Sequence, residues 1–147
     1  MKINLTVDEK EILYKLQAMR LSYFQSEPIP RIDREYQEMV ADELQQMMGQ
    51  LKKLNEGYIE FSKQQMHINI TLLDVLIYSM GIFAQNDRNV QKSTEGIEEK
   101  LHIIAIAKEL RQKIVSVLLP DPWFGESESI QRAAYSCYEM INGWGNI

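Results

Sequence analysis

Apolar residues recur at steps of three and four through residues 36–61, and this stripe constrains the fold more than any other feature of the chain. The spacing lies near a 3.5-residue repeat, which is typical of helices that pack against one another in bundles. It predicts one long helix over about 33–55 or longer. The members of the stripe are Tyr36, Val40, Leu44, Met47, Leu51, Leu54, Tyr58 and Phe61. Gly57 leaves two alternatives open: a helix that ends before a left-handed glycine, or a helix that runs on to Phe61.

Two further helices are predicted from their capping residues. Thr6 and Glu9 match a capping box, in which each side chain accepts a hydrogen bond from the backbone of the other, and a helix follows to about Tyr23. Thr71 and Asp74 match the same pattern. The helix after them is apolar nearly all round, and we therefore expect it in the middle of the domain.

Two more helices complete a predicted all-α fold, a bundle of about five helices. One covers about 94–119 and ends at Pro120, and a C-terminal helix covers 128–142. The 147 residues include only 7 glycines and 4 prolines, and so few turn residues favour long helices over many short strands. The length fits a single domain, 1–147, with a core that needs no disulfide or metal.

A short sequence near the start of the chain returns 65 residues later, because Ile3-Asn4-Leu5-Thr6 resembles Ile68-Asn69-Ile70-Thr71. Each copy alternates apolar and polar residues, which is a strand pattern, and each ends in a threonine that can cap a helix. A minor two-stranded ribbon from residues 3–5 and 68–70 is therefore predicted. We expect helices to cover it, because an isolated two-stranded ladder is marginally stable.

A second similarity supports an internal duplication. Residues 41–46 resemble residues 107–112 at an offset of 66. Together the two similarities predict repeat halves over 2–64 and about 67–119, with the C-terminal helix as an addition. The alternative is chance, because capped helix starts and strings of Ala, Glu, Leu and Gln are common in helical proteins.

Charge and cysteine usage exclude several classes of function. The net charge is -5, and the basic residues between Lys108 and Lys113 are spread around a helix, so a nucleic-acid partner is disfavoured. Cys137 is the only cysteine, which fits a reducing compartment. The most apolar stretch, 68–84, is predicted to be too short and too polar to span a bilayer. The expected location is the cytoplasm, without a membrane partner.

No set of residues predicts a catalytic or metal site. Glu99 and His102 have the spacing found in di-iron helical bundles, but His67 has no glutamate three residues before it to supply the second motif. The acidic residues of the 33–55 helix are predicted to form a solvated face, because Mg²⁺ needs further carboxylates from a facing helix. These residues are Glu35, Glu38, Asp42 and Glu43. Cys137 lies on an apolar stripe, where a cysteine behaves as a small hydrophobe. We expect no cofactor.

The candidate interaction surface combines residues of the 33–55 helix with a later aromatic pair. Methionines adapt their shape and are common on surfaces that accept partners. Trp123 and Phe124 follow a Pro-Asp-Pro turn, where aromatic side chains either anchor a partner or plug the end of the bundle. The alternative for the methionines is a wide core face. The candidate residues are Met39, Glu43, Met47, Met48, Trp123 and Phe124.

The predicted function is that of a non-enzymatic, protein-binding regulator or inhibitor, such as an immunity-type or accessory protein of bacteria or phage. A homodimer through the 33–55 helix is expected, because closed two-fold dimers are the commonest oligomers. The alternative is a small metal- or nucleotide-dependent enzyme, or a small-molecule binder, with a site among the helices 33–55, 71–84 and 94–119. Residues that would line that site are Tyr36, Tyr58, Tyr78 and His102.

Overall fold

The computed structural model describes residues 1–26, 34–90 and 95–118. Within these ranges the elements follow the order β1 (Lys2–Leu5), α1 (Val7–Ser26), α2 (Arg34–Lys53), β2 (Gly57–Glu60), α3 (Lys63–Val90) and α4 (Glu95–Leu118). The predicted, mostly helical fold is confirmed, although the described part of the chain has four helices rather than five. The predicted C-terminal helix over 128–142 lies outside the described residues.

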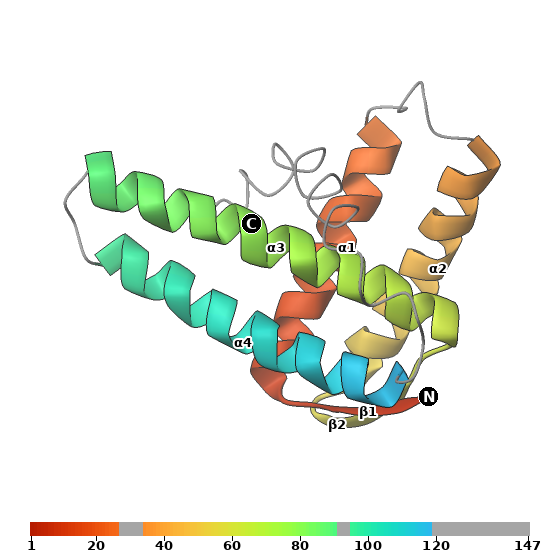
Figure 1. Ribbon diagram of the computed structural model, residues 1–147. Coiled ribbons are helices and arrows are strands. Elements are labelled where there is room, and N and C mark those ends of the chain that lie inside the picture. The colour runs from red at the N-terminus through yellow and green to blue at the C-terminus, as the bar shows by residue number, and fades with distance from the viewer. Residues whose placement is uncertain (27–33, 91–94, 119–147) are drawn as a thin grey trace.

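The elements form two successive β-α-α units, β1-α1-α2 and β2-α3-α4. In each unit the two helices form a hairpin, and Figure 1 shows the α3-α4 hairpin crossing the α1-α2 hairpin. The two strands lie side by side at the base of the molecule, where they form an antiparallel ribbon. The strands thus join the two hairpins, and helices cover the inner face of the ribbon.

A capping box opens the first helix of each unit. Thr6 N–H donates to Glu9 Oε1 over 3.0 Å, and Glu9 N–H donates to Thr6 Oγ1 over 3.1 Å. The box predicted at Thr6 is therefore confirmed. Ser62 and Gln65 form the equivalent box at the start of α3, with distances of 2.9 and 3.1 Å. Each box satisfies two backbone donors that the helix itself leaves unpaired.

The predicted strand at residues 68–70 is wrong, because these residues lie inside α3. Thr71 does not cap the helix; its hydroxyl donates to the carbonyl oxygen of His67, one turn earlier, over 3.1 Å. The physical reason is the wider context: buried Met66, Ile70 and Leu73 recur at three and four, so the helical period outweighs a short alternation. The partner of β1 is β2 instead.

The two units are related at an offset of 56 rather than the 65 inferred from the repeated tetrapeptide. Both Thr6 and Ser62, and Glu9 and Gln65, are 56 residues apart. Ile3 pairs with Ile59 across the ribbon at the same separation, so equivalent residues face each other, as a local two-fold axis requires. The described elements thus repeat the order β-α-α, and the second unit begins at β2 and not at residue 67; an internal duplication of the sequence stays a prediction.

Gly57 marks the end of α2 and the start of β2. Helix α2 ends at Lys53, and Gly57 has a φ of 116°, a conformation that side chains other than glycine rarely adopt. Of the two alternatives, the helix that ends before a left-handed glycine is correct. The helix that runs on to Phe61 is wrong, since residues 57–60 form a strand.

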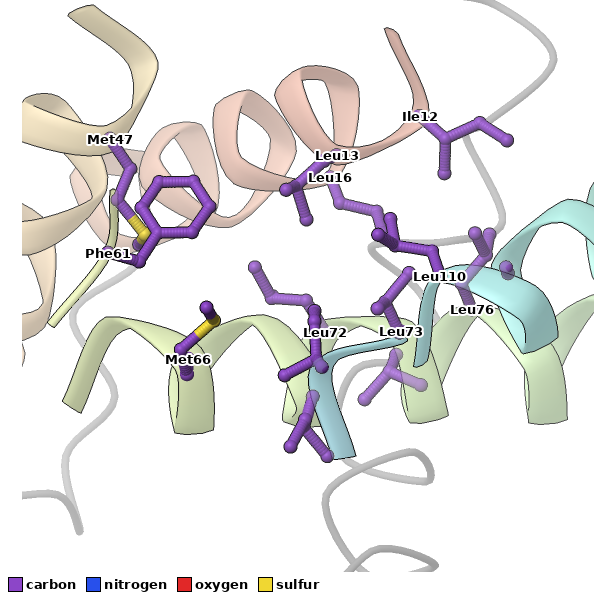
Figure 2. Packing of buried hydrophobic residues seen from close by; sticks show 14 of the residues in the cluster. Ile12, Leu13, Leu16, Met47, Phe61, Met66, Leu72, Leu73, Leu76 and Leu110 are labelled. Carbon is purple, nitrogen blue, oxygen red and sulfur yellow. The ribbon is translucent and has the colours of Figure 1, made fainter. Parts of the chain in front are cut away.

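The core lies where the inner face of the ribbon meets α1, α3, α4 and the buried side of α2. Figure 2 shows the Phe61 ring next to Met47, with Met66 of α3 opposite them and Leu13 and Leu16 of α1 pointing towards α3. All five side chains are buried. Helix α3 buries most of its circumference, which confirms its predicted place in the middle of the domain.

Helix α3 is longer than the sequence predicted, because it begins at Lys63 and not after Thr71. Its stretch Lys63–Ala84 has the length and composition of a membrane span, although the chain was predicted to contain none. However, 56% of the strongest window is buried within the protein, and two of its buried residues, Asn69 and Asp74, are polar. This burial fits the core helix of a soluble protein. The cytoplasmic location stays a prediction.

Candidate interaction surface

Helix α2 lies at the edge of the molecule (Figure 1), and its buried residues lie on one side of the helix. Its buried residues are Val40, Leu44, Met47 and Leu51, which form a narrow seam. The opposite side is exposed along the whole helix and contains no large apolar residue. Its members are Arg34, Glu35, Glu38, Asp42, Gln45, Gln46, Gly49, Lys52 and Lys53. The exposed face of α2 means these nine residues below.

The structure does not bring the predicted methionines together on one surface. Met47 is completely buried in the core, while Met39 and Met48 are half-buried. Nine residues separate Met39 from Met48, which is two and a half helical turns, so they border the buried seam on opposite sides. Met47 therefore belongs to the core and Met39 packs against its edge, while the use of this helix as an interaction surface stays a prediction.

Of the other predicted surface residues, Glu43 contacts another part of the chain, and the two aromatic residues lie outside the described ranges. Glu43 is half-buried and accepts a hydrogen bond from Gln65 Nε2 over 2.8 Å, which links α2 to the start of α3. Its carboxylate therefore has a structural partner within the chain. Trp123 and Phe124 lie outside the described residues.

The residues of the alternative small-molecule site lie on the surface. Tyr36, Tyr58 and Tyr78 are 53%, 72% and 41% exposed, and His102 is also exposed. Glu99 is exposed as well, as expected for a solvated face of α4. In the part of the chain that the structure describes, no three His, Cys, Asp or Glu side chains come close enough to hold a metal ion.

A buried ion pair connects α3 to α4. Asp74 Oδ1 lies 2.5 Å from Arg111 Nε, and the side chains of Asp74 and Arg111 are 9% and 26% exposed. Burial raises the pKa of Asp74 above its usual 3.8, and the hydrogen bond and the charge of Arg111 lower it only in part. Asp74 Oδ2 is buried and has no hydrogen-bond partner among the described residues. The sequence interpretation made Asp74 a helix cap and missed this pair.

A second buried carboxylate is bound by the same end of α4. Lys113 Nζ lies 2.5 Å from Glu9 Oε1 and 3.2 Å from the carbonyl oxygen of Asn4. Glu9 is only 2% exposed and also serves the Thr6 capping box. One lysine thus ties α4 to both β1 and α1. Perturbed and buried charges can mark active sites, but each of these carboxylates has a single cationic partner from a neighbouring element, which is typical of a structural pair.

Two buried amides form a polar contact inside the core. Gln17 Nε2 of α1 donates to Asn69 Oδ1 of α3 over 2.9 Å and lies 3.6 Å from the Met47 sulfur of α2. Both amide side chains are completely buried. Three helices therefore meet at one hydrogen-bonded point, which fixes their relative positions.

Replacing Gln17 with leucine is expected to lower the free energy of unfolding by about 1–3 kcal/mol, because Asn69 would stay buried without its partner. The double variant Gln17→Leu/Asn69→Val should recover part of this loss, since no unpaired amide remains. Chemical denaturation of the native chain, the two single variants and the double variant measures the difference. A double variant that is no more stable than Gln17→Leu would contradict the pairing.

Comparisons with family models, with curated proteins and with solved structures gave no match to this chain.

Proposed function

We propose that the protein is a non-enzymatic regulator or inhibitor that binds another protein chain through α2. The observation that carries this proposal is the exposed face of α2. It runs for twenty helical residues at the edge of the molecule, and its centre is polar and uncharged. Its first half is net acidic, with three carboxylates beside Arg34, and its last turn is basic. Charged faces of this kind give a contact its specificity and speed its formation.

The alternative, a small enzyme or a small-molecule binder, has weaker support. It needs its aromatic and acidic side chains to converge between α2, α3 and α4. Tyr36, Tyr58 and Tyr78 instead point to solvent from three different elements. Concave, mostly apolar sites with a few convergent polar groups are usual for small ligands, and these residues do not form one.

Photo-crosslinking in cells of the native host tests the proposal. A photoreactive amino acid at Gln46, on the exposed face of α2, is expected to give a covalent adduct with a protein after illumination. The matched control is Gln112, which is equally exposed on α4. Mass spectrometry then distinguishes an adduct with a second copy from an adduct with another protein. Equal adducts at both positions, or none at Gln46, would overturn the proposal.

A further inference from the structure

The exposed face of α2 carries opposite charges at its two ends. Arg34 and Glu35 lie in the first turn, Glu38 and Asp42 follow, and Lys52 and Lys53 lie in the last turn, so the first half of the face is net acidic and its end is basic. Between them are only Gln45, Gln46 and Gly49. Such a face is complementary to itself when a second helix lies against it in the opposite direction, because each acidic end then meets a basic end.

The helix macrodipole also favours acidic residues near the start of a helix and basic residues near its end. Helices α1 and α4, however, have no basic residue in the last turn. The separation of charge is therefore a feature of α2 and not of the helices in general.

Gly49 gives a second, independent indication. A glycine in a helix interior costs about 0.5–1 kcal/mol relative to alanine. A Cβ atom at position 49 would meet no other atom within 4 Å, so nothing in the described chain requires a glycine there. The close approach of another backbone is a physical reason for a small residue at this place. Gly81 in α3 is also exposed with open space around it, but α3 has only Lys63 as a charged residue among its described exposed positions.

We infer that α2 pairs in antiparallel orientation with α2 of a second copy, around a two-fold axis that passes near Gln45 and Gln46. This register sets Glu38 opposite Lys53 of the second copy, and Gly49 opposite Asp42 of the second copy. Both contacts occur twice, as a two-fold axis requires. The open space at Gly49 lets the two helices approach at the short end of the usual range, about 8–10 Å between axes.

The interface is polar, and the dimer is therefore weak and sensitive to salt. Screening shortens the range of exposed charge interactions to about 3 Å at 1 M salt, compared with about 10 Å at 0.1 M. Sedimentation equilibrium should show a dimer at low salt that dissociates as salt is added. A protein that stays monomeric at low salt up to about 1 mM would overturn the inference.

Charge reversal tests the antiparallel direction. Glu38→Lys/Asp42→Lys leaves Glu35 as the only acidic residue of the face, and Lys52→Glu/Lys53→Glu leaves Arg34 as its only basic residue. Each variant alone is expected to dimerise at least about ten-fold more weakly than the native chain, because like charges then face each other. Mixed in equal amounts, the two should form a heterodimer. Variants that dimerise as well as the native chain, or a mixture that stays monomeric, would contradict the inference.

Gly49→Ala is expected to change the stability of the fold and the affinity of the dimer in opposite directions. In the isolated chain this change is expected to raise the melting temperature, because it removes a glycine from a helix without a clash. In the dimer the added methyl group should weaken association about ten-fold or more. Gly81→Ala is the matched control, with the same gain in melting temperature and unchanged association. Equal association of the Gly49→Ala variant and the native chain would place the interface elsewhere.

The inference rests on the proposed function, and the two fail in different ways. A monomeric native chain that still forms adducts at Gln46 with another protein would remove the self-pairing and keep the binding role of α2. The absence of adducts at Gln46 with any protein, the second copy included, would remove both.

Discussion

Replacing Phe61 with alanine is expected to lower the free energy of unfolding by about 3–5 kcal/mol, the usual loss for a large buried aromatic side chain. Phe61 is 1% exposed and lies where the ribbon meets α2 and α3, with its ring next to Met47 (Figure 2). Its backbone also exchanges two hydrogen bonds with Met1, over 2.9 and 3.0 Å. These bonds hold the backbone that carries the ring in position. Removing the ring leaves a cavity that these fixed surroundings can fill only in part.

Urea denaturation followed by circular dichroism measures this loss. Tyr58→Ala is the matched control, because Tyr58 is an aromatic residue in the adjacent strand that is 72% exposed. Its replacement should change the free energy of unfolding by about 0.5 kcal/mol or less. A loss below about 1 kcal/mol for Phe61→Ala would show that the junction of ribbon and helices is not part of the cooperative core.

The role of Phe61 also shows where the sequence was ambiguous. Tyr58 and Phe61 continue the apolar spacing of α2, so these residues are compatible with a longer helix as well as with a strand. Ile59 and Phe61 also alternate with polar neighbours, which is the strand period, and a run this short satisfies both periods. The left-handed Gly57 decides between them, because it ends the helix and turns the chain into β2. The Ser62 and Gln65 capping box could have predicted the start of α3 from the sequence.

Local features were predictable, and long-range partners were not. The Thr6 box, strand β1 and the approximate limits of α2 and α4 depend on residues within a few positions of one another. The partner of Asp74 lies 37 residues away on α4. A charged residue in an otherwise apolar helix indicates that some partner must exist, since an unpaired buried charge is costly. The choice of Arg111 over its neighbours Lys108 and Lys113 depends on how α3 and α4 align, which periodicity does not fix.

The candidate interaction surface was likewise predictable from the sequence only in its local features. Periodicity predicted the seam of α2 correctly from Val40 to Leu51, but Tyr36, the first residue of the predicted stripe, is 53% exposed. It could not show whether methionines beside the seam face a partner or the protein's own core, because both uses need the same spacing. The exposed charges of α2 and Gly49 were visible in the sequence. They indicate an interface only once the helix is known to lie at the edge of the fold, with open space at Gly49.

Replacing Arg111 with glutamine is expected to lower the free energy of unfolding at pH 7 by about 2–4 kcal/mol, because Asp74 would remain buried without its cation. The loss should depend on pH. Burial already raises the pKa of Asp74 in the folded protein above 3.8, and removing Arg111 raises this pKa further, since its charge and hydrogen bond both lower it.

The direction of the pH dependence follows from linkage. A carboxyl group whose pKa is raised by folding contributes most to stability below its ordinary pKa of 3.8, and this contribution is lost as the pH rises through its folded-state pKa. The deficit of Arg111→Gln relative to the native chain should therefore be largest at neutral pH and shrink on acidification towards pH 3.8, as Asp74 becomes protonated.

Chemical denaturation over a range of pH values measures this deficit. The double variant Asp74→Asn/Arg111→Gln should recover most of the stability at pH 7, because no buried charge remains. Lys108→Gln, an exposed position on the same helix, is the control and should change stability by about 0.5 kcal/mol or less at every pH. A deficit that stays constant with pH, or that persists in the double variant, would mean that Arg111 stabilises α4 by packing and not by its charge. Arg111 and Lys113 each hold a buried carboxylate from a different element, so the outcome also decides whether charge pairs or apolar contacts fix the C-terminal half of α4 against the rest of the fold.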